Sequence, residues 1–297
     1  MNKILVSGLI NIETTLKVDS FPIEYEPVRY PFFGVNSTVS GVGYNITKAL
    51  TVLGNSVNFT SVIGKDFAGK LVKDTLSSIN INTDYILDLM TRTPQSVIIF
   101  DKEGKRAINT DLKDIQDIIY PAESFDKALS ESSIAVLCNI NFSRPHLEKA
   151  KKTGKIIATD VHALTSIGDE YNQDFMKYAD ILFLSNVNLE ETPEKFSKKV
   201  INKFGNDIIV IGLGKEGVLL CVKKDNFCER IPAVNLRKVV NTVGAGDALF
   251  SCFIHYYNKT KDPYGSIKKA LVFTDYKIGT ESASEGFLTE TELEKII

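Results

Sequence analysis

The sequence predicts an α/β fold in which helices cover both faces of a central, mostly parallel sheet, with a smaller β region added. Three observations lead to this prediction. Short apolar runs alternate with helical patterns along the chain. One run, Ile-Ile-Val-Ile at residues 208–211, is of the kind that lies buried on both faces of a parallel sheet. Two longer segments, at about 12–38 and 93–110, do not follow the alternation.

The alternation assigns the elements in chain order. Strands are expected at residues 3–9, 56–64, 133–140, 155–160, 180–185 and 207–214. Helices are expected at residues 43–53, 67–79, 145–153, 170–178, 193–204 and 248–257. Parallel neighbours need helical crossovers, so these helices should pack on the sheet. We therefore expect one domain over residues 1–297.

The two segments that leave the alternation are expected to form a small β lid. Segment 93–110 is typical of a hairpin, with Glu103-Gly104 at its turn. An ordinary surface excursion is the alternative, although long loops in compact domains are usually functional or disordered. Within 12–38, the aromatic residues Tyr30, Phe32 and Phe33 could stack on a substrate base or simply build the lid.

Composition excludes several classes of partner. The 297 residues are 43% hydrophobic, and 35 Lys and Arg nearly balance 37 Asp and Glu. No basic field of the kind that nucleic acid or an anionic membrane requires is present in the sequence. No run approaches the roughly 18 apolar residues of a membrane span, and the start does not resemble a signal peptide. We expect a cytoplasmic protein with a small-molecule partner. The cysteines, which lack metal-type spacing and suit a reducing compartment, are Cys138, Cys221, Cys228 and Cys252.

The stretch VVNTVGAGDALFSCF, residues 239–253, places glycines and an aspartate at the start of a predicted helix. Backbone N–H groups are free at a helix N-terminus, and the helix dipole favours an anion there. The amides of Gly244, Ala245 and Gly246 could therefore hold a phosphate, while Asp247 accepts a proton from an attacking hydroxyl. From this stretch alone, a tight turn followed by a favourable first-turn acid is an equally good interpretation.

Four collinear motifs resemble those of the ribokinase-like (PfkB) carbohydrate kinases. They are SGVGYNITKALTVLGNSVNFTSVIGKDFAGK at 40–70, DILFLSNVNLEE, VIGLGKEGVLL and NTVGAGDALFSCF, and they span nearly the whole chain. The last is similar to the family signature D-T-x-G-A-G-D-x-F. The resemblance implies a three-layer α/β/α ribokinase-like fold with a small β lid. It also implies a kinase that uses ATP and Mg²⁺ to phosphorylate a hydroxyl of a small sugar.

The resemblance also implies roles for individual residues. Asp247 would be the base, and Gly41, Gly43 and Asn45 would contact the sugar. Glu13 stands where the family commonly has an aspartate that accepts two sugar hydroxyls, and its extra methylene implies a smaller or differently placed acceptor. The nucleotide positions would be Asn186, Gly212, Gly214, Gly217 and Thr242, with segment 267–283 beside the adenine. A plain strand-edge turn is the alternative for these glycines.

Three positions depart from the family pattern. Asn241 replaces an aspartate that the family often uses near a monovalent cation; its carbonyl could still coordinate, but a negative charge is lost. Asn186 is followed three residues later by leucine, so Glu190 is a weak choice for orienting water around magnesium, against a solvated first-turn acid. Val42, between Gly41 and Gly43, replaces a polar or basic residue that some sugar kinases carry, which would make the pocket there more apolar.

Other functions remain open. SGVGYN is also close to the G-G-V-G-x-N form of pseudouridine kinases, which suggests a nucleoside acceptor. A non-catalytic sugar-binding regulator would not need Asp247, and a dinucleotide oxidoreductase is disfavoured because LVSGLIN lacks G-x-G-x-x-G. Lids in this family often form dimers, so a homodimer through the lid is expected. The histidines His146, His162 and His255 have no metal spacing, and we assign them packing or surface roles.

Overall fold

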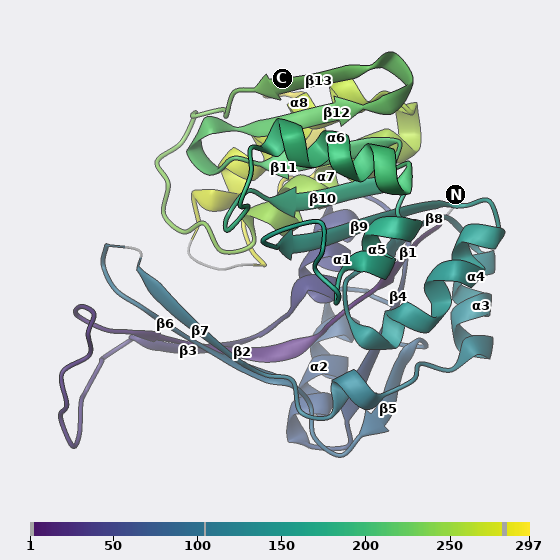
Figure 1. The fold of residues 1–297 in the computed structure, drawn as a ribbon. Helices are drawn as coiled ribbons and strands as arrows, with labels where there is room; N and C mark the ends of the chain where they lie inside the picture. Colours follow the sequence, from purple (N-terminus) through teal and green to yellow (C-terminus); the bar gives the residue numbers. More distant parts are fainter. Residues whose placement is uncertain (1–2, 104, 281–283) are drawn as a thin grey trace.

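The computed structural model describes residues 3–103, 105–280 and 284–297, and within these ranges the strands form two sheets (Figure 1). In the larger sheet, the described strands follow the order β13-β12-β11-β10-β9-β8-β1-β4-β5. Their bounds are β1 Lys3–Ser7, β4 Val57–Gly64, β5 Ile86–Met90, β8 Ser132–Leu137, β9 Ile156–Ala163, β10 Ile181–Ser185, β11 Ile208–Gly212, β12 Val218–Val222 and β13 Phe227–Ile231. Neighbours from β5 to β11 run parallel, and β12 and β13 continue that edge antiparallel.

Helices cover both faces of this sheet. They are α1 Val42–Val52, α2 Phe67–Ser78, α3 Ala122–Ser130, α4 Leu147–Lys152, α5 Gln173–Tyr178, α6 Pro193–Phe204, α7 Ala245–Thr260, α8 Pro263–Ile278 and α9 Glu290–Glu294. Strand β1 shows the division, because Ile4 and Val6 pack with α1, α7 and α8, whereas Leu5 packs with α3 to α6. The predicted three-layer architecture is confirmed, although the alternation had not assigned β5, β12, β13, α3, α8 or α9.

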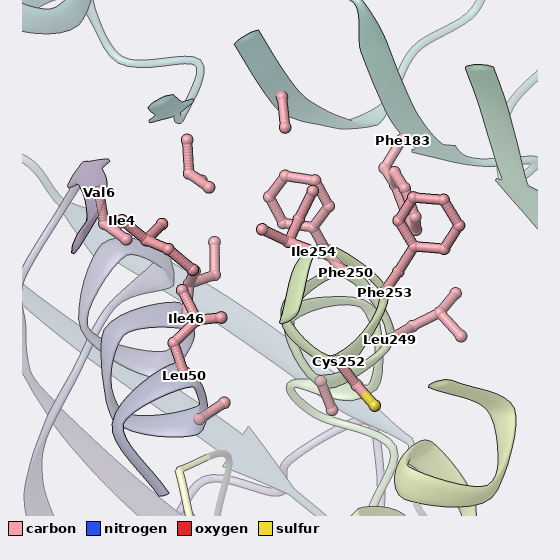
Figure 2. Packing of buried hydrophobic residues seen from close by; sticks show 14 of the residues in the cluster. Ile4, Val6, Ile46, Leu50, Phe183, Leu249, Phe250, Cys252, Phe253 and Ile254 are labelled. Atoms are coloured by element: carbon pink, nitrogen blue, oxygen red, sulfur yellow. The ribbon is translucent and has the colours of Figure 1, made fainter. Parts of the chain in front are cut away.

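Helices α1 and α7 are anchored side by side through a shared core (Figure 2). Ile46 and Leu50 of α1 are fully buried, as is Phe250 of α7. The ring of Phe183 on β10 lies 4.8 Å from that of Phe250 and 5.2 Å from that of Phe253. Aromatic pairs at such distances add to the stability that burial alone provides. The first turns of the two helices are therefore held by a rigid support.

The second sheet has the order β3-β2-β6-β7 within the described residues. Its strands are β2 Asn11–Lys17, β3 Val35–Ser40, β6 Gln95–Phe100 and β7 Arg106–Asp111. Glu13 pairs with Ser96, and Phe100 pairs with Arg106, so strand alternation puts Glu13 and Arg106 on one face. The expected turn at Glu103-Gly104 includes Gly104, which lies outside the described residues.

The loop between β2 and β3 projects away from the large sheet (Figure 1). It carries Tyr30, Phe32 and Phe33, whose exposed fractions are 76%, 84% and 107%. Tyr30 and Phe32 stack on each other with ring centroids 6.4 Å apart. The N–H of Lys17 donates to the Gly34 carbonyl at 2.8 Å, so Phe32 and Phe33 lie where the loop rejoins β3.

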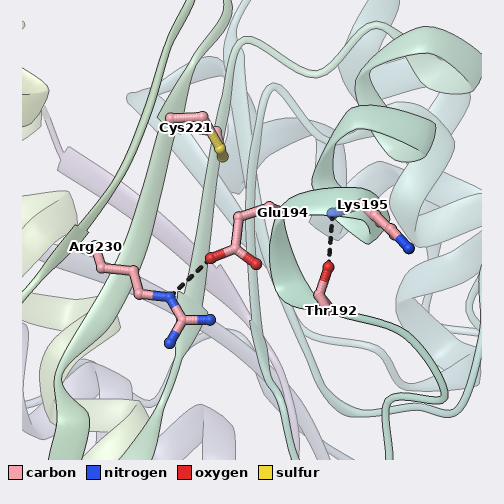
Figure 3. The surroundings of a disulfide bond; sticks show 6 residues. Thr192, Glu194, Lys195, Cys221 and Arg230 are labelled. Carbon is pink, nitrogen blue, oxygen red and sulfur yellow. Dashed lines mark hydrogen bonds and ion pairs between the residues drawn. A yellow bond between two sulfur atoms is a disulfide. The ribbon is translucent and has the colours of Figure 1, made fainter.

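Two of the cysteines differ from expectation. Cys221 of β12 and Cys228 of β13 are direct neighbours in the hairpin and form a disulfide (Figure 3). The ion pair between Arg230 and Glu194, with 2.7 Å between Nε and Oε1, joins the same edge to α6. Cys138 and Cys252 are buried free thiols. The two cysteines are seven residues apart in sequence and come into contact only through the register of the hairpin, which the sequence did not predict.

In the part of the chain that the structure describes, no helix has the combination of length and apolar character needed to cross a membrane.

Candidate active site

The N-terminus of α7 is open. Gly244 precedes the helix with φ 77°, and no side chain caps this end. The first amides of a helix have no partner within the helix. A Cβ on Gly246 would lie 3.8 Å from its nearest neighbour, an oxygen of Asp160, so the space beside it is free. The N–H of Ala245, however, donates to the Thr242 carbonyl at 3.2 Å, so this member of the expected anion hole is engaged in a turn.

Two residues from distant motifs meet at this end of α7. Asp247 lies in the first turn of α7 and Asn45 in the first turn of α1. The Nδ2 of Asn45 donates to Oδ2 of Asp247 at 2.8 Å. Their exposed fractions are 5% and 8% for Asn45 and Asp247. The two helices thus bring the predicted base and the predicted substrate contact together.

The Asp247 carboxyl lies in a strongly charged environment. Burial raises the pKa of Asp247, and the Asp160 carboxylate adds to the rise. The hydrogen bond from Asn45 and the charges of His162 and Lys277 act in the opposite direction. A carboxylate with a raised pKa is a stronger base, which suits proton abstraction from a hydroxyl.

Glu13 of β2 faces the same site. Its Oε2 accepts a hydrogen bond from the Ser40 hydroxyl at 3.1 Å. Burial raises the pKa of Glu13, and the Asp247 charge raises it further, while Lys277 lowers it. These charges act on one another, so Glu13, Asp247 and Lys277 lie in one neighbourhood.

Buried acceptors without donors line this region. The Oδ1 atoms of Asn11 and Asn45 are buried and find no hydrogen-bond partner among the described residues. The Nδ2 of Asn11 donates to the Ser96 hydroxyl. Native proteins rarely leave buried polar atoms unsatisfied. A ligand rich in hydroxyl donors would complement these oxygens and the two carboxylates.

Sequence reasoning missed Asn11, although a signal was present. Asn11 and Glu13 are two positions apart on β2, and alternation puts both on one face. The N-I-E pattern at the start of a strand could therefore have identified Asn11 together with Glu13.

The glycines at 41 and 43 lie against neighbouring backbone, and their expected contact with a sugar stays a prediction. A Cβ on Gly41 would lie 2.7 Å from the Leu9 carbonyl oxygen. A Cβ on Gly43 would lie 2.5 Å from the carbonyl carbon of Gly8. Neighbouring backbone atoms occupy the space that a side chain would need, so a ligand is not needed to explain either glycine.

The glycines after β11 divide into two kinds. A Cβ on Gly217 would lie 2.1 Å from the Ile231 carbonyl oxygen, which supports the strand-edge interpretation. Gly214 has φ 60° and open space where its Cβ would be, as close approach of a ligand would require. Gly212 ends β11, and its carbonyl accepts the N–H of Asn186 at 3.0 Å.

The expected adenine segment, 267–283, belongs largely to α8, and its residues 281–283 lie outside the described ranges.

Three charged side chains near Asp247 were not predicted as site residues. Lys277 of α8 is fully buried, and its Nζ donates to the Val243 carbonyl. Arg106 of β7 donates to the Thr242 hydroxyl at 3.4 Å, which links the second sheet to the loop before α7. His162 was assigned a packing or surface role, but its charge affects the pKa of Asp247. All three are distant in sequence from the signature motif.

Glu190 and Asn241 are the residues that the sequence predicts at metal sites. Glu190 follows β10, and its N–H donates to the Thr165 carbonyl at 3.1 Å. The Oδ1 of Asn241 accepts the Val243 N–H at 2.9 Å. Among the described residues, no three His, Cys, Asp or Glu side chains gather as a metal site. Magnesium in kinases needs only one or two carboxylates together with phosphates and water.

Comparison with known proteins identifies the family. The model of the pfkB family carbohydrate kinases matches residues 1–289, and the chain belongs to this family. It is therefore an ATP-dependent phosphotransferase that acts on a sugar or nucleoside hydroxyl. The ribokinase of Dictyostelium discoideum is 26% identical over 320 aligned residues, covering 95% of this chain and 97% of the relative.

Solved structures share the fold. The microbiome-derived acarbose kinase Mak1 superimposes with a TM-score of 0.90 at 23% identity, covering 99% of this chain and 98% of Mak1. A nucleoside kinase of Burkholderia thailandensis, solved with inosine, gives 0.77 at 16% identity, covering 99% and 97%. Since both kinds of kinase share the ribokinase-like fold, the fold alone does not select the acceptor.

Proposed function

We propose that this chain transfers the γ-phosphoryl group of ATP to a hydroxyl of a small carbohydrate, with Asp247 as the general base. The observation that carries the proposal is the hydrogen bond between Asn45 and Asp247, made where α1 and α7 begin. It fixes a buried carboxylate beside open helix amides and next to acceptors that lack donors. That combination suits a hydroxyl that must be held, deprotonated and joined to phosphorus.

The proposed reaction assigns a task to each group. The carboxylate of Asp247 takes the proton of the acceptor hydroxyl while the oxygen of that hydroxyl bonds to the γ-phosphorus. The bond from that phosphorus to the β,γ-bridging oxygen breaks, and ADP leaves. The amides of Gly244 and Gly246, and that of Ala245 once released from its turn, hold the equatorial oxygens. Glu13 and Asn45 orient the sugar by accepting its hydroxyl hydrogens, and Asn11 joins them.

The nucleotide is placed at the carboxyl ends of β10 and β11, where ligands of open parallel sheets bind. Gly212, Gly214 and Asn186 lie at this edge, and Thr242 lies on the loop that reaches the anion hole. Magnesium would reduce the repulsion between the phosphates, with Glu190 holding it through water. Gly217 is explained by packing and is not assigned a nucleotide contact.

A sugar is favoured over a nucleoside by the position of the aromatic loop. Tyr30, Phe32 and Phe33 would be the residues that stack on a base; they are exposed and belong to the β2–β3 loop, which projects away from the large sheet (Figure 1). The residues around Asp247 instead offer several hydroxyl acceptors. A polyhydroxyl acceptor fits this set better than an aromatic base.

The test is ADP release, measured by a coupled assay, over a panel of pentoses, deoxypentoses, hexoses and nucleosides. Asp247→Asn should abolish turnover of the best sugar, because amide nitrogen and oxygen cannot take the proton. Asp174→Asn, which changes an exposed first-turn aspartate of α5, is the matched control and should keep full activity. Full activity in Asp247→Asn, or turnover confined to nucleosides, would refute the proposal.

We also propose that the second sheet mediates a homodimer. One of its faces bears a hollow of about 450 Å³ lined by Gln95, Val97, Asn109, Thr110 and Asp111. Val35 on β3 and Val97 on β6 are exposed, at 56% and 41%. Light scattering after size-exclusion chromatography should give twice the chain mass, and Val97→Lys should shift it toward the monomer.

A further inference from the structure

We propose that the Lys277 ammonium is a built-in cation that replaces the free monovalent cation expected beside Asn241, so that this kinase does not depend on potassium. The inference rests on the proposed function, because it concerns the loop that presents the anion hole. It assigns Lys277 a positioning role: the ammonium acts on the loop and not on the substrate.

The contact that supports this role is unusual. Lys277 has no exposed surface, and its Nζ donates to the carbonyl of Val243, directly before Gly244. A buried ammonium is costly unless hydrogen bonds and opposite charges compensate. Burial lowers the pKa of Lys277 to about 8, whereas the Asp247 and Glu13 carboxylates act to raise it. At neutral pH the side chain is therefore still mostly a cation.

The loop oxygens do not fit a free cation. The Val243 carbonyl is bonded to Lys277, and the Thr242 carbonyl accepts the Ala245 N–H. The side-chain oxygen of Asn241 accepts the Val243 N–H and carries no negative charge. Hard cations are held by several oxygens, commonly including carboxylates. The expectation of a potassium site at Asn241 is therefore replaced by a tethered ammonium.

The end of α8 supports the same loop at further points. The N–H groups of Val240 and Asn241 donate to the Ile278 carbonyl at 2.8 and 3.1 Å. The Asp275 carboxylate accepts the Leu236 N–H at 3.1 Å. Lys277 thus lies at the end of α8, which holds the loop before α7 at several points.

Peptide geometry connects this support to the anion hole. The Val243 carbonyl and the Gly244 N–H belong to one peptide plane, and in a trans peptide they point in opposite directions. When Lys277 holds the carbonyl, the Gly244 N–H is directed away from Lys277. The ammonium therefore fixes the orientation of an amide that the proposed mechanism uses.

The experiment compares cations at equal ionic strength. Wild type should release ADP at the same rate in potassium chloride and choline chloride. Lys277→Met, which fills the volume with an apolar chain, should lose about tenfold or more in choline, as expected for a lost charge-assisted hydrogen bond. Potassium or ammonium ions should restore part of that rate. Lys269→Met changes a partly exposed lysine of the same helix, paired with Glu294, and should show neither effect.

A second readout does not need turnover. Melting temperature without substrates should be the same in both salts for wild type, whereas potassium should specifically stabilise Lys277→Met. A potassium-dependent rate or melting temperature in wild type would overturn the proposal, even if the variant fails to fold. Equal activity of Lys277→Met and wild type in choline would also overturn it. If no substrate is turned over, the melting comparison still decides, so failure of the proposed function is seen separately.

Discussion

Helices α7 and α8 have the same length and pack against each other, but they begin in opposite ways. Each has 16 residues. At the start of α8, the Asp262 carboxylate accepts the N–H groups of Tyr264 and Gly265, and Pro263 follows the cap. At the start of α7, Gly244 provides no capping side chain. One helix end is closed by a side chain, whereas the other has no capping side chain.

On the proposed mechanism, the start of α7 gives up stability for function. A side-chain cap contributes about 1 kcal/mol, and α7 forgoes it where a phosphate would take the place of the cap. The buried Asp247 at the same end adds a charge that burial disfavours. The four variants below test this difference between the two helix ends.

The largest effect is expected from Asp247→Asn at the open end. Loss of a general base should reduce kcat by about 10²–10⁴-fold. Because burial raises the pKa of Asp247, its ionisation destabilises the fold as pH rises through the folded pKa. The variant should therefore be more stable than wild type at pH 7 in urea denaturation. The gain should vanish as the pH falls below the unfolded pKa of about 4, where wild-type Asp247 is protonated in both states; a gain independent of pH would contradict this explanation.

Lys277→Met tests the charge that α8 delivers to the open end. The folded pKa of about 8 lies below the ordinary 10.5, so between these values the unfolded chain binds more protons. As the pH rises through this window, wild type should gain stability relative to the variant, by about 3 kcal/mol in total. The facing charges are Glu13, Asp247 and Arg106. If the unfolding free energies of wild type and Lys277→Met changed in parallel from pH 7.5 to 10.5, Lys277 would not be buried as a cation.

Gly244→Ala should separate backbone strain from function. Its φ of 77° is in the left-handed region, where a Cβ costs about 1–2 kcal/mol. Gly205→Ala, at the end of α6 with φ 83°, should lose similar stability. Only Gly244→Ala should also reduce kcat. Equal kinetic effects in the two variants would mean that the loop before α7 has no special role.

The smallest effect is expected at the closed end. Asp262→Ala removes the acceptor for two amides and should cost about 1 kcal/mol of stability. Its kcat/KM should equal that of wild type at a temperature where both are folded. A kinetic defect there would show that the start of α8 also matters for catalysis.

The alternating pattern was sufficient to predict six parallel strands of the large sheet, because each is a local apolar run, but it did not assign β5, α3, α8 or α9. The hairpin edge of β12 and β13 and the disulfide within it were not predicted, since they depend on register. Motif resemblance placed Asn45 and Asp247 in one site, and the structure brings them into contact. Their roles in catalysis stay predictions.

Side chains that reach the site through tertiary packing could not be found in this way. Lys277 is one lysine among many in a helical pattern, and only the antiparallel packing of α8 on α7 brings its ammonium to Val243. Arg106 reaches Thr242 because the second sheet approaches the loop. The close approach of neighbouring backbone at Gly41 and Gly43 was likewise not predicted, and their contact with a sugar stays a prediction.

The close approach of Gly8 and Gly43 also limits how this protein can diversify. A Cβ on Gly8 would lie 2.8 Å from the Cα of Gly43, so the floor of the site is backbone against backbone. Neither position can gain a side chain without separating α1 from β1. On the proposed function, changes of acceptor preference are expected on strands β2, β6 and β7, where substitutions leave that floor untouched.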